Sequence, residues 1–205
     1  MTNNQKKQRL SRMEAKAQTR QDLLTAAGIE FAQQGFHGTS IDRIAEQAGY
    51  TKGAVYTHFS SKEALYLDLL HAHLAKTEHT FESLMASGKP VAFVIDELSK
   101  NYFSELEKNR DWAILTVEFF IHAMRHQDIK LQLVNKIRTA QKNIETALVN
   151  RLNHSNEALP MTIEQTALAL LSFNNGIDLL SLIDPQQALP NVYQSVLKLL
   201  LTKLD

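Results

Sequence analysis

Residues 39–65 decide the fold, because TSIDRIAEQAGYTKGAVYTHFSSKEAL contains two short helical patterns with one tight turn between them. Ser40 is a good N-cap, apolar residues recur at helical spacing from Ile41, and Gly49 is the residue type that commonly ends a helix. Two residues later, a second helix is predicted over residues 52–59. Two helices of about eight residues joined this closely have the geometry of a helix-turn-helix.

Helices are also predicted on both sides of this stretch. Upstream, residues 20–34 place four apolar side chains on one stripe and stop at Gly35. Downstream, six helices are predicted: one from residue 62 to the break at 87–90, one from there to the break at 109–111, and then 112–125, 127–152, 163–183 and 190–204. No alternating pattern of useful length predicts a strand. The sequence therefore predicts an all-α fold of about nine helices, with an N-terminal three-helix domain and a C-terminal helical bundle domain.

The composition excludes several classes of protein. Of 205 residues, 44% are hydrophobic and 21% charged, as in an ordinary globular chain. There is no cysteine, which excludes disulfides, thiolate zinc sites, iron–sulfur clusters and thiol redox switches. The first ten residues are polar and basic, without the apolar segment of a secretory signal. The longest apolar stretch, residues 167–173, is far shorter than the ~18 residues that span a bilayer, so we expect a cytoplasmic protein.

Charge is divided unevenly along the chain, although the net charge is zero. Residues 1–62 contain nine basic and five acidic side chains, whereas residues 63–205 contain 13 basic and 17 acidic ones. Such asymmetry suggests a polyanionic partner for the N-terminal part alone. The alternative is a basic, solvated tail without a partner.

The helix predicted at residues 52–59 has the side chains that a DNA-recognition helix needs. Its apolar anchors are Val55 and Phe59, and Gly53 and Ala54 are small enough for the backbone to approach DNA closely. Around the anchors it exposes groups that can bind phosphates or base edges, namely Lys52, Tyr56, Thr57 and His58. The alternative is a surface helix with an ordinary polar face.

Residues 20–69 carry a longer pattern in fixed register. It comprises Leu24, Ala26, Ala27, Phe31, Gly35, Phe36, Thr39, Ser40, Ile41, Ile44, Ala45, Ala48 and Gly49, followed by Tyr50 to Tyr56, His58, Phe59, Lys62, Glu63 and Leu65. This pattern resembles the DNA-binding domain of the TetR/AcrR transcriptional regulators. One departure is Tyr50, because the family usually has a small aliphatic residue in the turn.

The resemblance implies a homodimer whose N-terminal domains bind the half-sites of a palindromic operator, repress by occlusion and leave the DNA when a small ligand enters the C-terminal domain. It implies a basic arm at residues 1–19, a helix-turn-helix domain at 20–62 and a ligand-binding and dimerisation domain at 63–205. Carried over by position, Thr39, Tyr56, His58 and Lys62 resemble phosphate contacts, and Arg43, Lys52, Gly53, Ala54 and Thr57 face base edges. Thr51, at the start of the second helix, completes this DNA-binding set.

Side-chain chemistry agrees with this division. Arg43 and Lys52 can reach guanine O6 and N7, and Ala54 or the Thr57 methyl group can contact a thymine methyl. Six residues are predicted to be core instead: Ile41, Ile44, Ala45, Ala48, Val55 and Phe59. In the arm, Arg12, Lys16 and Arg20 share one helical face if the first helix begins early. The arm either adds contacts to DNA or is a mobile terminus.

The C-terminal part carries no catalytic constellation, so we predict that the protein is not an enzyme. Glu118, His122 and His126 lie at i, i+4 and i+8 on one helical face. On a straight helix they span about 12 Å, too far to meet one ion together. Two of them with a ligand from elsewhere, a polar pocket wall, or a histidine near the helix dipole are the alternatives. We predict no metal and no cofactor.

A ligand pocket is predicted in the C-terminal domain. An apolar cavity with a few convergent polar groups is the usual form of such a site. The candidate residues are Tyr102, Trp112, Leu115, Glu118, Phe119, His122, Asn174 and Asp178. The alternative is that Asn174, Asn175 and Asp178 form hydrogen bonds within the core or at a dimer interface.

The last two helices supply more apolar surface than one small domain must bury, through Leu168, Leu171, Ile177, Leu180, Val192, Val196, Leu199 and Leu200. In the family the corresponding helices pair across a two-fold axis. We therefore expect a nucleoid-associated, dimeric, DNA-binding regulator, a repressor released from a palindromic operator by a small-molecule effector. The alternative is a ligand-independent architectural or chromosome-binding protein that uses the same DNA domain.

Overall fold

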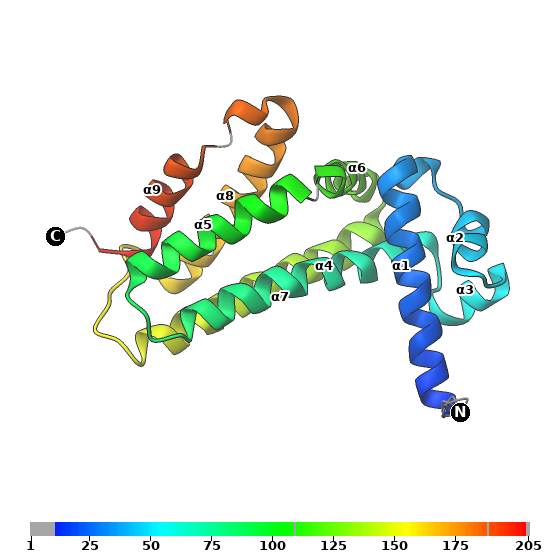
Figure 1. The fold of residues 1–205 in the computed structure, drawn as a ribbon, viewed down its shortest axis with the longest axis horizontal. Coiled ribbons are helices and arrows are strands. Elements are labelled where there is room, and N and C mark those ends of the chain that lie inside the picture. The colour runs from blue at the N-terminus through cyan, green and yellow to red at the C-terminus, as the bar shows by residue number, and fades with distance from the viewer. Residues whose placement is uncertain (1–10, 109, 188, 204–205) are drawn as a thin grey trace, which may run out of the picture. The chain divides into compact units, whose positions relative to one another are not determined.

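The computed structural model describes residues 11–108, 110–187 and 189–203, and the chain divides into two compact units after Leu69. The first unit contains α1 (Arg12–Gly38), α2 (Ile41–Ala48), α3 (Lys52–His58) and the start of α4 (Lys62–Met85). The second contains the rest of α4, α5 (Val91–Lys108), α6 (Arg110–Arg125), α7 (Gln127–Leu152), α8 (Ile163–Ile183), the short 3-10 helix η1 (Pro185–Gln187) and α9 (Pro190–Leu201) (Figure 1). Within the described ranges there are nine α-helices and no strand, which confirms the predicted all-α class.

Helix α1 begins earlier than residue 20, the predicted start. Ser11 and Glu14 form a capping box at its N-terminus: Ser11 Oγ accepts from the Glu14 N–H at 3.2 Å, and Glu14 Oε2 accepts from the Ser11 N–H at 2.7 Å. Gly35, the predicted stop, leaves helical geometry with φ 68°, but the chain turns helical again up to Gly38. Part of the predicted arm is therefore helical, while Lys6, Lys7 and Arg9 lie outside the described residues.

An aromatic cluster forms the core of the first unit and explains where that unit ends. Phe31 and Phe36 of α1 stack with their ring centroids 5.8 Å apart. Tyr66 of α4 meets both rings edge-on, at 5.5 and 5.6 Å. Leu65 and Leu67 on either side are also buried. The start of α4 thus belongs to the first unit, and the division falls after Leu69, beyond the boundary at residue 62 that the sequence predicted.

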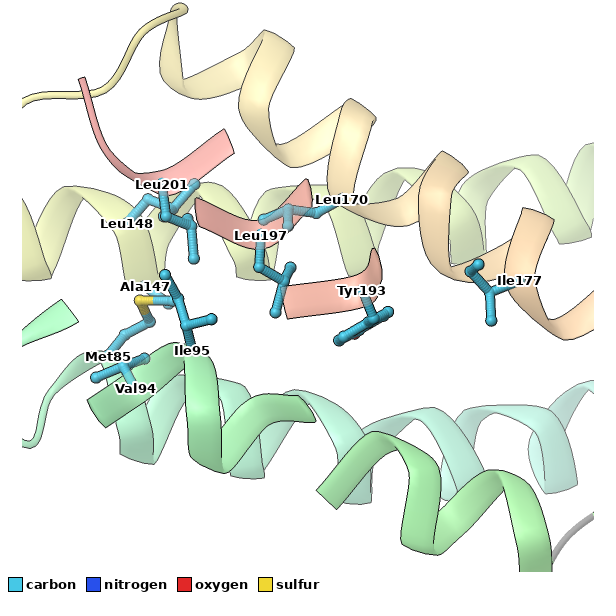
Figure 2. Close-up of a cluster of buried hydrophobic side chains, with 10 residues drawn as sticks. All are labelled: Met85, Val94, Ile95, Ala147, Leu148, Leu170, Ile177, Tyr193, Leu197 and Leu201. Carbon is cyan, nitrogen blue, oxygen red and sulfur yellow. The ribbon is translucent and has the colours of Figure 1, made fainter. Parts of the chain in front are cut away.

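The second unit is a bundle around one large core. In it α5 packs on α9, and α7 packs on α6 and α8. Figure 2 shows the buried side chains that fill this core: Met85, Val94, Ile95, Ala147, Leu148, Leu170, Ile177, Tyr193, Leu197 and Leu201. Arg151 closes one end of the bundle, since its buried guanidinium donates to both carboxylate oxygens of Glu157 and to the Lys89 carbonyl.

Helix α8 is more apolar on average than the sequence prediction allowed. Its mean hydropathy of 1.4 over 18 residues makes it long and apolar enough, by those two measures, to cross a membrane. Polar residues such as Asn174 and Asp178 break its longest apolar run without lowering this average much. Only 28% of that window is buried within the chain, although α8 packs on α6, α7 and α9. Much of its apolar surface is therefore left uncovered in a single copy of the chain.

Candidate nucleic-acid interface

Side-chain hydrogen bonds start the two short helices, and a glycine separates them. Ser40 Oγ accepts from the Arg43 N–H at 3.3 Å at the start of α2, and Thr51 Oγ1 accepts from the Ala54 N–H at 3.2 Å at the start of α3. Gly49 ends α2 with φ 74°, a left-handed conformation that strains residues with a side chain. The turn predicted from these residue types is confirmed.

A buried layer holds α2 and α3 in place. Five of the six residues predicted to be core are buried, and the sixth, Ala48, is half-buried; the five are Ile41, Ile44, Ala45, Val55 and Phe59. Helix α2 packs on both α1 and α3. Side chains on the outer face of α3 therefore project from a packed support rather than from a loop.

Tyr50, the departure from the family pattern, has a structural partner. Its hydroxyl donates to Asp22 Oδ2 on α1 at 2.9 Å. A small aliphatic residue in this turn has no hydroxyl and cannot make this bond. The tyrosine therefore ties the turn between α2 and α3 to α1.

The outer face of α3 is polar and accessible. Thr51, Lys52, Gly53, Tyr56 and Thr57 are exposed, and Ala54 and His58 are half-buried. Seven of the ten residues in the predicted DNA-binding set thus share one short element and the residue before it. They form a continuous surface that a polyanion can reach.

Gly53 is not required by the fold. A Cβ atom built there meets nothing closer than Thr51 Oγ1 at 3.8 Å, an ordinary van der Waals distance, and the residue does not have positive φ. Glycine weakens a helix relative to alanine, by up to about 1 kcal/mol. The packing of the chain therefore gives no reason for a glycine at position 53.

The two predicted guanine-reading side chains each lie against a carboxylate. Arg43 Nε lies 3.0 Å from Glu30 Oε2 of α1, and Lys52 Nζ donates to Asp42 Oδ2 at 2.8 Å. This hydrogen bond and the charge of Asp42 raise the pKa of Lys52, so its ammonium stays protonated. Sequence reasoning missed Glu30, although an acid in register with the buried residues of α1 was a visible signal.

Two predicted phosphate contacts turn inward. Thr39 is buried, and its hydroxyl contacts the carbonyls of Glu30 at 3.0 Å and Gly35 at 2.8 Å. Lys62 Nζ donates to the carbonyls of Phe36 at 2.8 Å and Thr39 at 2.9 Å, and burial lowers its pKa. The Thr39 hydroxyl therefore bonds to carbonyls near the end of α1, and two of the three donors of Lys62 do the same, so a phosphate contact of either residue stays a prediction.

Basic side chains of α1 lie near the end of α3. Arg20 pairs with Asp68 at 2.8 Å and its guanidinium lies over the Phe59 ring, 5.2 Å from the centroid. Burial, then the charges of Lys16 and Arg20, lower the pKa of His58. The helical face that the sequence predicted for Arg12, Lys16 and Arg20 is therefore exposed on α1, with its last two members close to the candidate interface.

The predicted ligand-pocket residues fall into two groups. Tyr102, Asn174 and Asp178 form one cluster with Tyr193: the Tyr102 hydroxyl donates to Asp178 Oδ1 at 2.6 Å, and the Tyr193 hydroxyl donates to Asn174 Oδ1 at 2.8 Å. The two tyrosine rings stack at 4.4 Å. Burial raises the pKa of Asp178. These residues satisfy one another in the core, as the alternative prediction held for Asn174 and Asp178.

The other five pocket candidates lie on α6. Leu115 and Phe119 are buried, and Trp112, Glu118 and His122 are half-buried. Trp112 stacks on His73 of α4 with ring centroids 4.2 Å apart. The rings of His122 and His126 are 4.3 Å apart, but no three His, Asp or Glu side chains of the described residues gather as metal ligands would.

A groove of about 480 Å³ lies elsewhere, between α7 and the start of α8. It is lined by Lys142, Glu145, Thr146, Val149, Thr162, Ile163 and Glu164. None of the eight predicted pocket residues lines it. The groove thus does not coincide with the site that the sequence predicted.

Comparisons with known proteins agree with this geometry. Residues 23–69 match the family described as bacterial regulatory proteins, tetR family. The chain is 27% identical over 170 residues to the HTH-type transcriptional regulator TtgR of Pseudomonas putida, covering 78% of each chain. It is 42% identical over 71 residues to the HTH-type transcriptional activator FasR of Mycolicibacterium smegmatis, covering 35% of this chain and 31% of FasR.

A solved structure extends the likeness to the second unit. The transcriptional regulator FadR of Bacillus subtilis, solved in complex with stearoyl-CoA, superposes with a TM-score of 0.69 over 90% of this chain and 99% of FadR. At 16% identity this similarity concerns the fold. The family match covers the two short helices whose caps, core and exposed donors are described above. Residues 23–69 of this chain are thus similar to the DNA-binding domain of the tetR family, and the relatives named above are transcriptional regulators.

Proposed function

We propose that the protein is a dimeric, site-specific repressor that occupies a palindromic operator and leaves it when a small effector binds the second unit. The observation that carries this proposal is the outer face of α3. Exposed donors there surround Gly53, a glycine that the chain itself does not need. In such a regulator, α3 enters the major groove while α2 crosses the backbone.

Within this proposal the DNA contacts divide into contacts with base edges and contacts with phosphates. Arg43 and Lys52 read guanine, and Ala54 with the Thr57 methyl group contacts thymine. Tyr56 and His58 bind phosphates, with Lys16 of the arm adding charge at longer range. Lys62 contributes its remaining N–H donor, while Thr39 acts through the backbone geometry that it fixes at the end of α1.

Exposed apolar side chains on α8 and α9 support the homodimer. On α8, about half of the surface of Leu168 and of Leu179 is exposed, and Ile183 is 78% exposed. Val192 and Leu199 of α9 are exposed as well, and α9 packs beside α8 (Figure 1). An apolar patch of this kind on a soluble chain marks an interaction surface. A second copy covers it symmetrically, and two-fold symmetry suits a palindromic operator.

The exposed apolar residues that would form this interface differ in part from those predicted. Four of the eight predicted side chains are exposed, namely Leu168, Leu180, Val192 and Leu199, and three are half-buried. Ile177 belongs to the core of its own chain. Leu179 and Ile183, which the prediction omitted, join the exposed set because they share the outward side of α8 with Leu168 at helical spacing.

The proposal also covers the chemical class of the effector and the position at which it binds. FadR, a structural relative, was solved with stearoyl-CoA, and half of the predicted pocket residues here are apolar or aromatic. We propose an apolar effector bound beside α6, near Trp112 and Phe119. Helix α4 belongs to both units, so a change in its second part alters the start of the same helix in the first. A typical coupling of this kind is ~1–3 kcal/mol.

Selection of bound duplexes from a random pool tests this function, followed by a titration at two salt concentrations. A palindromic consensus with a steep fall of affinity with salt is expected from a dimer that neutralises several phosphates. Weak, sequence-indifferent binding at many sites would contradict the proposal and favour an architectural, chromosome-binding role. A reporter placed behind the selected site separates repression from activation, the role named for FasR.

A further inference from the structure

Glu30 is a buried carboxylate directly beneath the candidate interface. Its side chain is only 8% exposed, and its ionic partner is Arg43, with Nε 3.0 Å from Oε2. Oε2 itself is shielded from water, and the Nε–H is not aimed straight at it, so charge rather than a well-aligned hydrogen bond holds the pair. A carboxylate removed from water needs an opposite charge beside it, so the position of the Glu30 carboxylate restrains that of the Arg43 guanidinium.

The backbone around Glu30 is held as firmly as its side chain. The Glu30 carbonyl accepts from Thr39 Oγ1 at 3.0 Å, and Lys62 Nζ in turn donates to the Thr39 carbonyl at 2.9 Å. The Lys62 ammonium also lies over the Phe36 ring, 4.6 Å from its centroid. The Glu30 carboxylate is thus anchored to the packed end of α1 and cannot follow a guanidinium that swings away.

Contact through Nε has a geometric consequence for Arg43. The side chain is half exposed, and the two terminal nitrogens of the guanidinium lie beyond the atom that faces Glu30. Guanine presents O6 and N7 on one edge, and two parallel N–H groups of an arginine match that pair of acceptors. An unrestrained guanidinium also binds any phosphate within reach, which adds affinity without sequence information.

The neighbouring pair between Lys52 and Asp42 is different. Both side chains are more than half exposed, with Nζ and Oδ2 2.8 Å apart. Such a surface pair is worth little and exchanges readily for water or phosphate. Asp42 therefore leaves Lys52 free to move, and it provides a control of the same chemistry without burial.

We propose that Glu30 is the positioning residue for guanine recognition by Arg43. It holds the Arg43 guanidinium at its Nε side, so that the terminal N–H groups meet a base edge in one orientation. The same contact keeps the guanidinium from binding nearby phosphates instead. Glu30 thereby contributes to sequence specificity without touching DNA. This inference rests on the proposed operator contact of Arg43 and adds the residue that makes the contact selective.

The test is a double-mutant cycle in the full chain, with the operator consensus selected separately for each variant. The variants are Glu30→Gln, Arg43→Ala and the two together, with Asp42→Asn as the control. Glu30→Gln is expected to relax the preference at one guanine of each half-site by about tenfold, the scale of one bidentate base contact, and to leave other positions unchanged. Combined with Arg43→Ala, it is expected to have no further effect on specificity.

Three results overturn the proposal. The first is an unchanged preference in Glu30→Gln, and the second is a uniform loss at every position, equalled by Asp42→Asn. The third is an effect of Glu30→Gln that persists when Arg43 is alanine. Thermal unfolding separates these from loss of fold; if the glutamine variant unfolds, Glu30→Asp keeps the charge but shortens its reach and is expected to relax the same guanine.

Failure of the proposed function gives a different outcome. Without any consensus from the unmodified chain, site-specific binding fails and the role of Glu30 fails with it. A clear consensus that Arg43→Ala leaves intact removes only the positioning role, because Arg43 then reads no base. The selection from the unmodified chain therefore distinguishes the two cases.

Discussion

Helices α3 and α8 expose side chains of opposite polarity. Helix α3 is short, buries Val55 and exposes polar donors, whereas α8 is long, turns Asn174 and Asp178 toward tyrosines and exposes leucines and an isoleucine. Helix α3 follows the rule of polar outside and apolar inside, whereas α8 breaks it on the face where a partner is proposed. A polar, backbone-accessible face fits a nucleic acid, and an apolar face fits a second copy of the chain.

The difference also concerns where each unit keeps its ionisable groups. In the first unit, Lys52 and Tyr56 lie in water. In the second, Asp178 is withdrawn from water, and burial raises its pKa. The candidate DNA contacts of α3 in the first unit are therefore exposed, whereas the polar groups of α8 in the second unit find partners inside.

A charge on the exposed side of α8 tests its assignment as the dimer face and has the largest expected effect. Leu179→Glu places a carboxylate in an apolar interface, where it has no partner. We expect the protein to sediment as a monomer at micromolar concentration and its affinity for the selected operator to fall by at least about 100-fold, roughly 2.7 kcal/mol.

Ile114→Glu is the matched control, since Ile114 on α6 is 45% exposed and Leu179 is 47% exposed. It is expected to keep the assembly state and the operator affinity. A Leu179→Glu chain that still sediments as a dimer would place the dimer contact elsewhere.

Acidification tests the claim that the second unit withdraws polar groups from water. Burial against Trp112 lowers the pKa of His73 from 6.5 to about 4. Because the folded chain binds this proton more weakly than the unfolded chain, stability falls as pH decreases from 6.5 toward 4, by at most about 3 kcal/mol.

His73→Phe keeps a ring beside Trp112 but cannot be protonated, so urea unfolding at pH 7 and pH 5 is expected to show a smaller loss in this variant. His71→Gln, an exposed position on the same helix, serves as the control and is expected to behave like the unmodified chain. Burial shifts the pKa of Asp178 in the stabilising direction on acidification, so the relevant quantity is the difference between variants. Equal losses in all three chains would show that His73 is accessible to water.

Gly53→Ala gives the smallest expected change and separates the needs of the fold from those of the partner. The chain has room for the added Cβ, so unfolding free energy is expected to rise by about 0.5–1 kcal/mol. Operator affinity is expected to fall, because the methyl group keeps the DNA at a greater distance. Tighter binding by the alanine variant would remove close backbone approach from the proposal.

Much of the interface could be predicted because it depends on local rules. The cap Ser40, the helix-ending Gly49 and the buried Val55 follow from residue type and spacing, and the structure confirms each of them. These features require only neighbours a few residues away. The same rules predicted that α1 runs into Gly35, where helical geometry is indeed interrupted.

The contacts that could not be predicted involve partners that are distant in sequence. Thr39 and Lys62 match family positions, but the end of α1 takes up the Thr39 hydroxyl and two donors of Lys62. Glu30 went unnoticed because its role depends on Arg43, which lies on another helix. The boundary after residue 62 preceded the true division because Tyr66 completes an aromatic cluster that only the folded chain assembles.

The division after Leu69 falls inside a continuous helix and not in a flexible linker. Recombination that exchanges effector domains among such regulators must therefore join two half-helices. Each residue added or deleted at the junction turns everything downstream by about 100° and shifts it by about 1.5 Å along the axis. Chimeras spliced at Leu69 without insertion keep the helical phase of α4, whereas a one-residue insertion changes it. The length of the junction in α4 therefore sets the helical phase at which the two units are joined, in steps of one residue.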